Sequence, residues 1–313
     1  MDRIATGAAL LVWALAASGP GLAQTGPPAT PATPATQPAT AAAPAETLPL
    51  AQDPTQRLTL PVMVNGKGPY DFLVDTGSDR SVISRELAAT LALPPGRRVT
   101  IHESAGSDRV STVIIDHLTV GARTIDHVEA PSLGADNLGA AGMLGVDALR
   151  DLHLVMDFKA MTLSSSPSRA EPLDEHTIVV RGKSRFGQLI LANAKIRGKP
   201  VLVVLDSGSQ VSVGNPALLK LLTGHDVSAK PDKTTVLVTV TGRRAEVELD
   251  VIAEAQIGGV LVRNMPLAFA PLPIFDRFHL TNQPALLLGM DVLSLCRKVT
   301  VDLRRHEATF TID

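Results

Sequence analysis

The chain carries two short acidic motifs whose residue types suit proton transfer: Asp75-Thr76-Gly77-Ser78 and Asp206-Ser207-Gly208-Ser209. Three apolar residues precede each aspartate, which predicts a buried strand that ends at a tight turn. Gly77 and Gly208 allow that turn and supply backbone N–H groups near the carboxylates. If the two turns face each other, the carboxylates lie close together. Like charges about 3 Å apart cannot both ionise, so such a pair shares one proton and can supply a base and an acid at once.

A second pair of matched segments extends the two motifs into a repeat of domain size. Gly145 follows Met143-Leu144, and Gly289 follows Leu287-Leu288. The two aspartates are 131 residues apart and the two glycines are 144 apart, so the second copy has the longer middle. A single three-residue motif would mean little in a chain of this length, whereas four matched segments in the same order are strongly specific.

A helix-like segment follows each acidic motif. It begins after Ser84 in the first copy and after Asn215 in the second, and both residue types are favoured N-caps because their side chains accept hydrogen bonds from free backbone N–H groups. Pro216 suits the first helical position. Each copy is therefore predicted to contain a strand, a tight turn and a short helix, in that order.

On these segments the chain resembles the aspartic proteases, specifically the bacterial retropepsin-like group, over roughly residues 57–313. The resemblance implies an all-β fold class, with two similar acid-protease β-barrel lobes that carry short helices and are related by a pseudo-twofold axis. It implies that Asp75 and Asp206 are the catalytic residues of an endopeptidase, and that Gly145 and Gly289 lie in segments that buttress the two turns. Because both aspartates are in one chain, we expect a monomer that forms an internal pseudodimer.

The resemblance also assigns roles to the hydroxyl groups of the motifs. The hydroxyls of Thr76 and Ser207 are expected to cross-link the two turns at the lobe interface. Those of Ser78 and Ser209 are expected to donate hydrogen bonds to the carboxylates, which would favour ionisation and an acidic working range.

Short helices are expected after the buttress segments, at residues 148–152 and 292–296. Asp147 and Asp291 occupy matching positions in the two copies, immediately before these segments. We expect them to cap the helices that follow rather than to take part in chemistry.

In each copy, the sequence also predicts a β-hairpin after the first helix. In the resembled family, a hairpin at this place is a flap that closes over bound peptide and excludes water. Gly106 and Gly242 lie in the two turns and are the candidate flap tips; the alternative is that both are ordinary core hairpins. The flanking strands are expected at residues 99–103 and 110–118 in the first copy, and at 234–240 and 245–251 in the second.

The remaining sequence surrounds the two copies. Arg3 precedes an apolar run at residues 4–17. Small residues up to Ala23 then occupy the positions that a signal peptidase recognises, which predicts a signal peptide cleaved after Ala23. The Pro, Ala and Thr residues that follow cannot form a core and predict a flexible tether. The expected divisions are a signal peptide at 1–23, a disordered linker at 24–56, a first lobe at 57–163, an inter-lobe linker at 164–175 and a second lobe at 176–313.

The signal peptide predicts an exported protein, in the bacterial periplasm or secreted. An uncleaved membrane anchor is the alternative, although the apolar run is shorter than the roughly 20 residues of a spanning helix. No cysteine lies near the cleavage site, so a lipid anchor is not expected. The only cysteine is Cys296, which excludes an internal disulfide; among apolar neighbours it is expected to be buried.

Composition argues against several other functions. The net charge of −2 and an aromatic content of 3% give no basis for nucleic-acid binding, and the basic cluster at residues 181–185 is expected to be a solvated loop. The chain has no HExxH spacing, no cysteine pair and no G-x-S-x-G motif, so we expect no metal, no cofactor and no serine nucleophile. The expected partner is a peptide or protein substrate.

Two rival interpretations remain at this stage. The protein could be a noncatalytic peptide-binding protein that keeps the cleft, because intact motifs do not guarantee that the two turns meet at working distance. Alternatively, its lobes could pair with those of a second chain, as the subunits of retroviral enzymes do.

Overall fold

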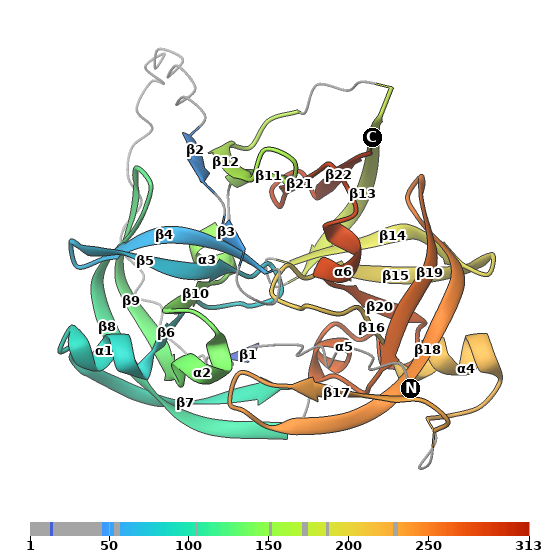
Figure 1. Cartoon of the computed structure of the whole chain (residues 1–313), viewed down its shortest axis with the longest axis horizontal. Coiled ribbons are helices and arrows are strands. Elements are labelled where there is room, and N and C mark those ends of the chain that lie inside the picture. Colours follow the sequence, from blue (N-terminus) through green and yellow to red (C-terminus); the bar gives the residue numbers. More distant parts are fainter. Residues whose placement is uncertain are drawn as a thin grey trace, which may run out of the picture.

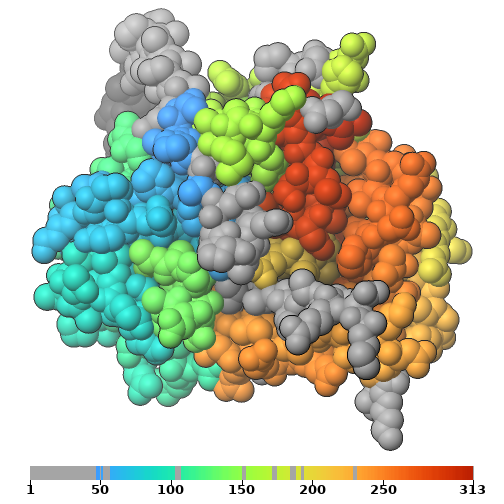
Figure 2. Space-filling model, in the orientation of Figure 1, coloured from blue at the N-terminus to red at the C-terminus, as the bar shows by residue number. Residues whose placement is uncertain are grey.

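Two similar lobes lie side by side in the protein, with a shared sheet across them (Figure 1). The computed structural model describes residues 13–14, 46–49, 51–52, 57–103, 106–149, 152–170, 175–185, 188–227 and 231–312. The space-filling view separates the first lobe, in blue to green, from the second, in yellow to orange (Figure 2). The predicted all-β fold of two acid-protease lobes with short helices is confirmed.

In the first lobe, strands close into a ring. In ring order they are β8 (Gly106–Val120), β9 (Arg123–Leu133), β6 (Val82–Ser84), β10 (Gly142–Leu144), β5 (Lys67–Val74) and β4 (Leu58–Val64). Antiparallel pairing of β4 with β8, with Val62 opposite Val120, completes the ring. Every second residue of β4 from Leu58 to Val64 is fully buried, because alternate side chains of a strand point to the same face.

Three further strands extend the first ring at its edges. β7 pairs with β8 to form the predicted hairpin, β1 pairs with the free edge of β7, and β3 pairs with β4. Their bounds are β7 (Pro95–Glu103), β1 (Trp13–Ala14) and β3 (Ala51–Gln52).

The second lobe repeats the ring. In ring order its strands are β18 (Arg244–Ile257), β19 (Val260–Phe269), β16 (Val213–Gly214), β20 (Ala285–Leu288), β15 (Lys199–Leu205) and β14 (Gln188–Ile196). Pairing of β14 with β18, with Ala194 opposite Ile257, closes it. The second hairpin joins β17 (Thr234–Val238) to β18.

A shared sheet joins the two rings and lies across the top of Figure 1. Its strands, in order, are β13 (Thr177–Arg185), β22 (Glu307–Thr311), β21 (Lys298–Asp302), β11 (Leu152–Asp157), β12 (Thr162–Pro167) and β2 (Glu46–Pro49). Three strands of the second copy lie beside three from the first part of the chain, and the two groups meet where β21 pairs with β11. A single apolar cluster runs from Leu60 in the first ring through Met156 and Val299 in the sheet to Val203 in the second. The lobes therefore share one core.

The shared sheet departs from the sequence-based boundaries. β2 and β3 fall inside the segment expected to be a linker at 24–56, and β12 continues to Pro167, inside the expected inter-lobe linker. The basic cluster at 181–185 lies in β13 rather than in a loop. β2, β12 and β13 each pair with a strand remote in sequence, so local composition could not reveal them, whereas β3 pairs with the neighbouring β4. β1 lies within the expected signal peptide, and apart from β1, β2 and β3 residues 1–56 lie outside the described residues.

Short helices occupy the ring ends: α1 (Arg85–Thr90), α2 (Ala135–Leu138), α3 (Val146–Leu149), α4 (Pro216–Thr223), α5 (Pro273–Arg277) and α6 (Met290–Leu293). The predicted N-caps are confirmed, since Ser84 accepts from the N–H of Leu87 and Asn215 from that of Leu218. α3 and α6 begin two residues before the expected positions. No helix among the described residues is long and apolar enough to cross a membrane.

Candidate active site

Each aspartate of the pair follows the end of a buried central strand. β5 runs parallel to β10, and the backbone N–H of Asp75 donates to the carbonyl of Leu144 (3.0 Å). In the second lobe β15 runs parallel to β20, and the N–H of Asp206 donates to the carbonyl of Leu288 (3.0 Å). The buttress strands β10 and β20 thus fix the start of both turns in the same way.

The two turns face each other in one chain. A Cβ atom added to Gly77 would overlap the carboxyl group of Asp206, and one added to Gly208 would overlap that of Asp75. Each carboxyl group is therefore packed against the backbone of the opposite turn, where only glycine leaves room.

Hydroxyl groups bind the turns together across the lobe interface. The hydroxyl of Thr76 donates to the carbonyl of Leu205 (3.2 Å), and that of Ser207 donates to the carbonyl of Val74 (2.8 Å). Each hydroxyl oxygen also accepts from the backbone N–H of the other residue, at 3.1 Å in both cases. These four reciprocal bonds are the cross-link that the family resemblance implied for this pair.

The carboxyl groups are almost completely buried, at 1% exposure each. One oxygen of each accepts a backbone N–H: Gly77 donates to Oδ1 of Asp75 (2.8 Å), and Gly208 donates to Oδ1 of Asp206 (2.9 Å). Among the described residues, no donor reaches either Oδ2 atom. A proton held by one carboxyl group supplies the missing donor, because the two side chains lie within hydrogen-bonding contact.

Burial raises the pKa of both carboxyl groups. The pKa of Asp75 rises from 3.8 to about 6, against the opposing effects of the contact with Asp206, the Gly77 N–H and the positive charge of Arg57. The pKa of Asp206 is raised well above its ordinary value by burial and by the negative charge of Asp75. Two carboxyl groups in contact cannot both ionise, so the dyad shares one proton.

The serines that end the motifs do not act as expected. The hydroxyl of Ser78 donates to the carbonyl of Arg80 (2.9 Å), and that of Ser209 donates to the carbonyl of Val211 (2.8 Å). Both hydroxyls stabilise the turn beyond the aspartate instead of the carboxylate. The backbone N–H groups of Ser78 and Ser209 do lower the pKa of Asp75 and Asp206, although burial outweighs them. The acidic working range stays a prediction.

Asp147 and Asp291 lie inside α3 and α6 rather than before them, and they do more than cap the helices. The carboxylate of Asp147 accepts from the N–H of Ala148 in the first turn of α3 (2.8 Å), and also from the backbone N–H (2.9 Å) and the hydroxyl (2.8 Å) of Ser81. Asp291 accepts from the same two groups of Ser212, at 2.9 and 2.7 Å. Each serine lies six residues after the aspartate of its motif, so these carboxylates anchor the far end of the turns to α3 and α6.

The predicted buttress glycines bind the same two serines, Ser81 and Ser212. The backbone N–H of Gly145 donates to the hydroxyl of Ser81 (3.2 Å), and that of Gly289 donates to the hydroxyl of Ser212 (3.1 Å). A side chain on either glycine would collide with the backbone of the turn it supports. Glycine at these positions lets each buttress strand approach the turn closely.

Two buried polar residues near the turns were not recognised from the sequence. Arg57 and Gln188 each lie 18 residues before the aspartate of their copy, and both side chains are buried. The amide of Gln188 donates across the lobe interface to the carbonyl of Gly77, whereas the guanidinium of Arg57 donates to the carbonyl of Leu138 (2.7 Å) in its own lobe. Their matched place in the repeat, before an apolar strand, was the signal that could have revealed them.

The candidate flap hairpins come together along the bottom of Figure 1. Gly106 begins β8, and residues 104–105 of that turn lie outside the described residues. Gly242 has a left-handed backbone (φ +87°), and its Cα lies against the side chain of Asn137 in the first lobe. The second hairpin therefore reaches across to the other lobe.

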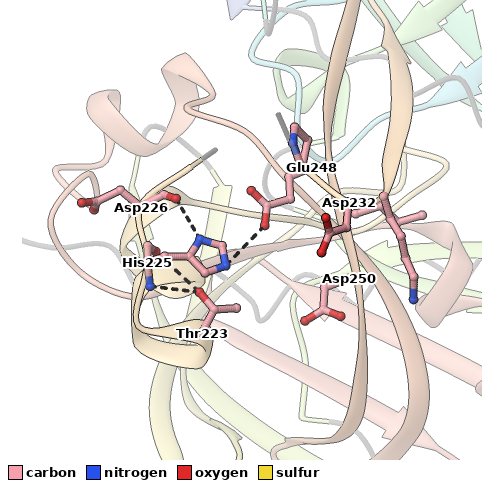
Figure 3. Close-up of a pocket in the computed structure, with 9 residues that line it drawn as sticks. Thr223, His225, Asp226, Asp232, Glu248 and Asp250 are labelled. Atoms are coloured by element: carbon pink, nitrogen blue, oxygen red, sulfur yellow. Dashed lines mark hydrogen bonds and ion pairs between the residues drawn. The ribbon is translucent and has the colours of Figure 1, made fainter. Parts of the chain in front are cut away.

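A cavity of about 510 Å3 lies elsewhere, in the second lobe between α4 and the base of its hairpin (Figure 3). His225 contacts the backbone carbonyl of Asp226 (2.9 Å) and lies 3.8 Å from a carboxylate oxygen of Glu248. None of the predicted site residues lines this cavity. Among the described residues, no group of three or more His, Cys, Asp or Glu side chains is arranged to hold a metal ion.

Comparison with known families agrees with the geometry. The family described as "gag-polyprotein putative aspartyl protease" matches residues 60–151, and the family described as "Aspartyl protease" matches residues 192–292. Each match covers one ring and its acidic turn. A search of curated proteins found no match. The chain therefore carries two retropepsin-like aspartyl protease domains, one in each lobe.

Proposed function

We propose that this protein is an aspartic endopeptidase that activates water between Asp75 and Asp206. The observation that carries the proposal is the pairing of two buried carboxyl groups, each packed on the glycine of the opposite turn, with the pKa of both raised by burial. A pair that shares one proton provides a base and an acid at one place.

The mechanism follows from the shared proton. The ionised carboxylate of the dyad takes a proton from the water molecule, whose oxygen attacks the peptide carbonyl carbon. The protonated carboxyl group gives its proton to the carbonyl oxygen, so the tetrahedral intermediate forms without a full negative charge. When the intermediate collapses, the C–N bond breaks, the departing nitrogen takes the proton that came from water, and a hydroxyl of the intermediate returns its proton to the other carboxylate. The dyad is thereby restored with one shared proton.

Peptide-library cleavage from pH 3 to 8 tests the proposal. Asp75→Asn and Asp206→Asn should each lower kcat by at least about a hundredfold, the usual contribution of a positioned acid or base. Asp71→Asn is the matched control, because Asp71 is exposed on β5, the strand that ends immediately before Asp75; it should leave kcat unchanged. A statine-containing transition-state mimic should block wild-type cleavage. If either of the two dyad variants kept full activity, the two-carboxylate mechanism would be wrong.

The same experiment separates the rival interpretations. A noncatalytic peptide-binding protein would retain the mimic but cleave no peptide at any pH. Lobes that pair between chains would require a dimer for activity. The geometry favours the single-chain pair, because Asp75 and Asp206 of one chain already meet. Titration with the mimic, combined with size-exclusion chromatography, should therefore give one binding site per monomer.

We also propose that the protein is exported, on the strength of the leader-like sequence at residues 1–23. Expression in a bacterial host followed by N-terminal sequencing of the periplasmic or secreted product tests this directly. A mature chain that begins after Ala23 would support export. An unprocessed chain in the membrane fraction would favour the uncleaved anchor.

A further inference from the structure

A buried histidine and a buried aspartate meet in the shared sheet, where β11 of the first copy pairs with β21 of the second (Figure 1). His153 lies opposite Asp302, and its Nδ1 atom is 3.3 Å from Oδ2 of that carboxylate. Both residues are almost completely buried, at 1% and 2% exposure. Aspartate is almost never buried to this degree unless it is paired. The contact therefore joins the two copies at defined atoms.

The repeat places an equivalent pair at the other end of the same strands. Residues 154–158 match residues 299–303, so that His153 corresponds to Lys298 and Asp157 to Asp302. Asp157 lies opposite Lys298, and both are half-buried. Each aspartate also accepts a backbone N–H from the residue three positions later. Asp157 is thus the structural counterpart of Asp302, in a more open place.

The carboxylate of Asp302 also holds the segment that leaves the first lobe. Immediately after β12, the hydroxyl of Ser168 donates to Oδ1 (2.8 Å) and the backbone N–H of Arg169 donates to Oδ2 (3.1 Å). The N–H of Arg305 donates to Oδ1 (2.9 Å). Together with His153, four donors from three segments converge on one carboxylate, and hydrogen bonds to a charged acceptor are the stronger kind.

Each strand of the pair continues a segment that anchors one dyad turn. In the first lobe, Asp147 of α3 binds Ser81 of the turn, and β11 begins three residues after α3 ends. In the second lobe, Asp291 of α6 binds Ser212, and β21 begins five residues after α6 ends. The alignment of β11 on β21 thus helps to set where the two anchored turns lie relative to each other.

We propose that His153 and Asp302 form a positioning clamp, which holds the two lobes at the separation where Asp75 and Asp206 share one proton. The proposal rests on the endopeptidase function proposed above, and it gives the pair a role that is exerted through the turns. Loss of one partner leaves a buried polar group unsatisfied, so the strands must shift to admit water or another partner. Each dyad carboxyl group is packed on the opposite turn, and a displacement of about 1 Å can lower a rate by about a hundredfold.

Steady-state kinetics, with active sites counted by titration with the statine-containing mimic, test the clamp. His153→Leu and Asp302→Asn should each lower kcat by about tenfold to a hundredfold with little change in KM. Both should also move the acid limb of the pH profile to higher pH and the basic limb to lower pH, because separated carboxyl groups titrate more independently. His153→Asn keeps a donor near the position of Nδ1 and should recover much of kcat.

Two further variants calibrate the result. Asp157→Asn is the matched control, because Asp157 is the counterpart of Asp302 at the open end of the seam; it should behave as wild type. Ser168→Ala removes one of the four donors and leaves the His153 contact in place, so it should lower kcat by about two- to tenfold even if His153→Leu does not fold.

A purely structural role would reduce the yield of folded protein and its resistance to urea, but not the kinetics of each titrated site. The proposal is overturned if the folded variants of His153, Asp302 and Ser168 keep the wild-type kcat and pH profile. It is also overturned if Asp157→Asn loses as much kcat as Asp302→Asn, since any charge in the seam would then have the same effect.

Binding of the mimic separates this proposal from the endopeptidase function. If the wild-type protein cleaves no peptide, the endopeptidase function fails, whereas the affinity for the mimic from pH 3 to 8 still reports whether the two turns are held together. Its Kd should rise by about tenfold or more in His153→Leu and Asp302→Asn and stay unchanged in Asp157→Asn. An equal Kd in all three variants would rule out the clamp.

Discussion

The two lobes agree closely at the turns and differ in what surrounds them. Six residues after each dyad aspartate, a serine binds an aspartate of α3 or α6, and in both lobes a buttress glycine binds the same serine. Eighteen residues before the dyad aspartate, the two lobes carry different side chains, Arg57 in the first and Gln188 in the second. Four residues after it, Asp79 forms an ion pair with Arg277 of the other lobe, whereas the second lobe has Gln210. The repeat thus conserves the geometry of the dyad while the charged residues around its two turns differ.

The largest expected effect tests the contact that the two lobes share, the packing of each turn glycine against the opposite carboxyl group. Gly77→Ala and Gly208→Ala each place a methyl group on the opposite carboxyl group, so both should lose activity and be destabilised by about 3 kcal/mol, to similar extents. Gly134→Ala is the control, because its Cβ would meet mainly the flexible end of Arg85. Urea unfolding measures the difference. A large disparity between the two turn variants would show that the lobes are not equivalent at their closest contact.

A pH-dependent effect of similar size tests the burial of Asp75. A carboxyl group whose pKa is raised from 3.8 to about 6 binds its proton more tightly in the folded state than in the unfolded state. Stability should therefore fall as pH rises from about 4 through 6, by about 3 kcal/mol in total. Asp75→Asn should be more stable than wild type by that amount at pH 7 and equal to it at pH 3. Parallel stability profiles for the two proteins would mean that the folded state does not raise this pKa.

The helix caps provide a smaller effect that should differ between lobes. Ser84 caps α1 through one hydrogen bond, to Leu87, and Ser84→Ala should cost about 1 kcal/mol. Asn215 caps α4 and also binds the segment before β20, donating to the carbonyls of Leu280 and Gln283. Asn215→Ala should therefore cost about 2 to 3 kcal/mol, since it leaves buried groups unpaired. Equal losses on thermal unfolding would indicate that the additional bonds contribute nothing.

The smallest effect concerns Arg57, whose matching position in the second lobe is occupied by Gln188. Burial dominates the pKa of Asp75, and the charge of Arg57 lowers it. Arg57→Gln makes the first lobe resemble the second and should move the acid limb of kcat/KM, expected near pH 6, to higher pH. Arg57→Lys keeps the charge and should leave the limb closer to its wild-type position. A profile that stayed fixed in Arg57→Gln while activity fell would assign Arg57 a purely structural role.

The turns illustrate what local sequence predicts well. A run of apolar residues, an aspartate, a small hydroxyl residue and a glycine encode strand and turn within a few residues, and the N-caps at Ser84 and Asn215 work through neighbours three residues away. The matched copies predicted that two such turns would meet. The hydroxyls of Ser78 and Ser209 were misassigned because a hydroxyl can donate to any nearby acceptor, and in the folded turns they donate to the carbonyls of Arg80 and Val211.

The sequence by itself therefore determined the two lobes, the dyad and the glycines that let the turns touch, because short-range preferences and repetition encode all of them. The tertiary structure decided how far the pKa values of the two carboxyl groups are raised, since that depends on burial and on charges brought from remote positions. It also decided the shared sheet and the pairing of His153 with Asp302, contacts between segments more than a hundred residues apart. No local pattern specifies such contacts, because they form only when the packed core has fixed where each strand ends.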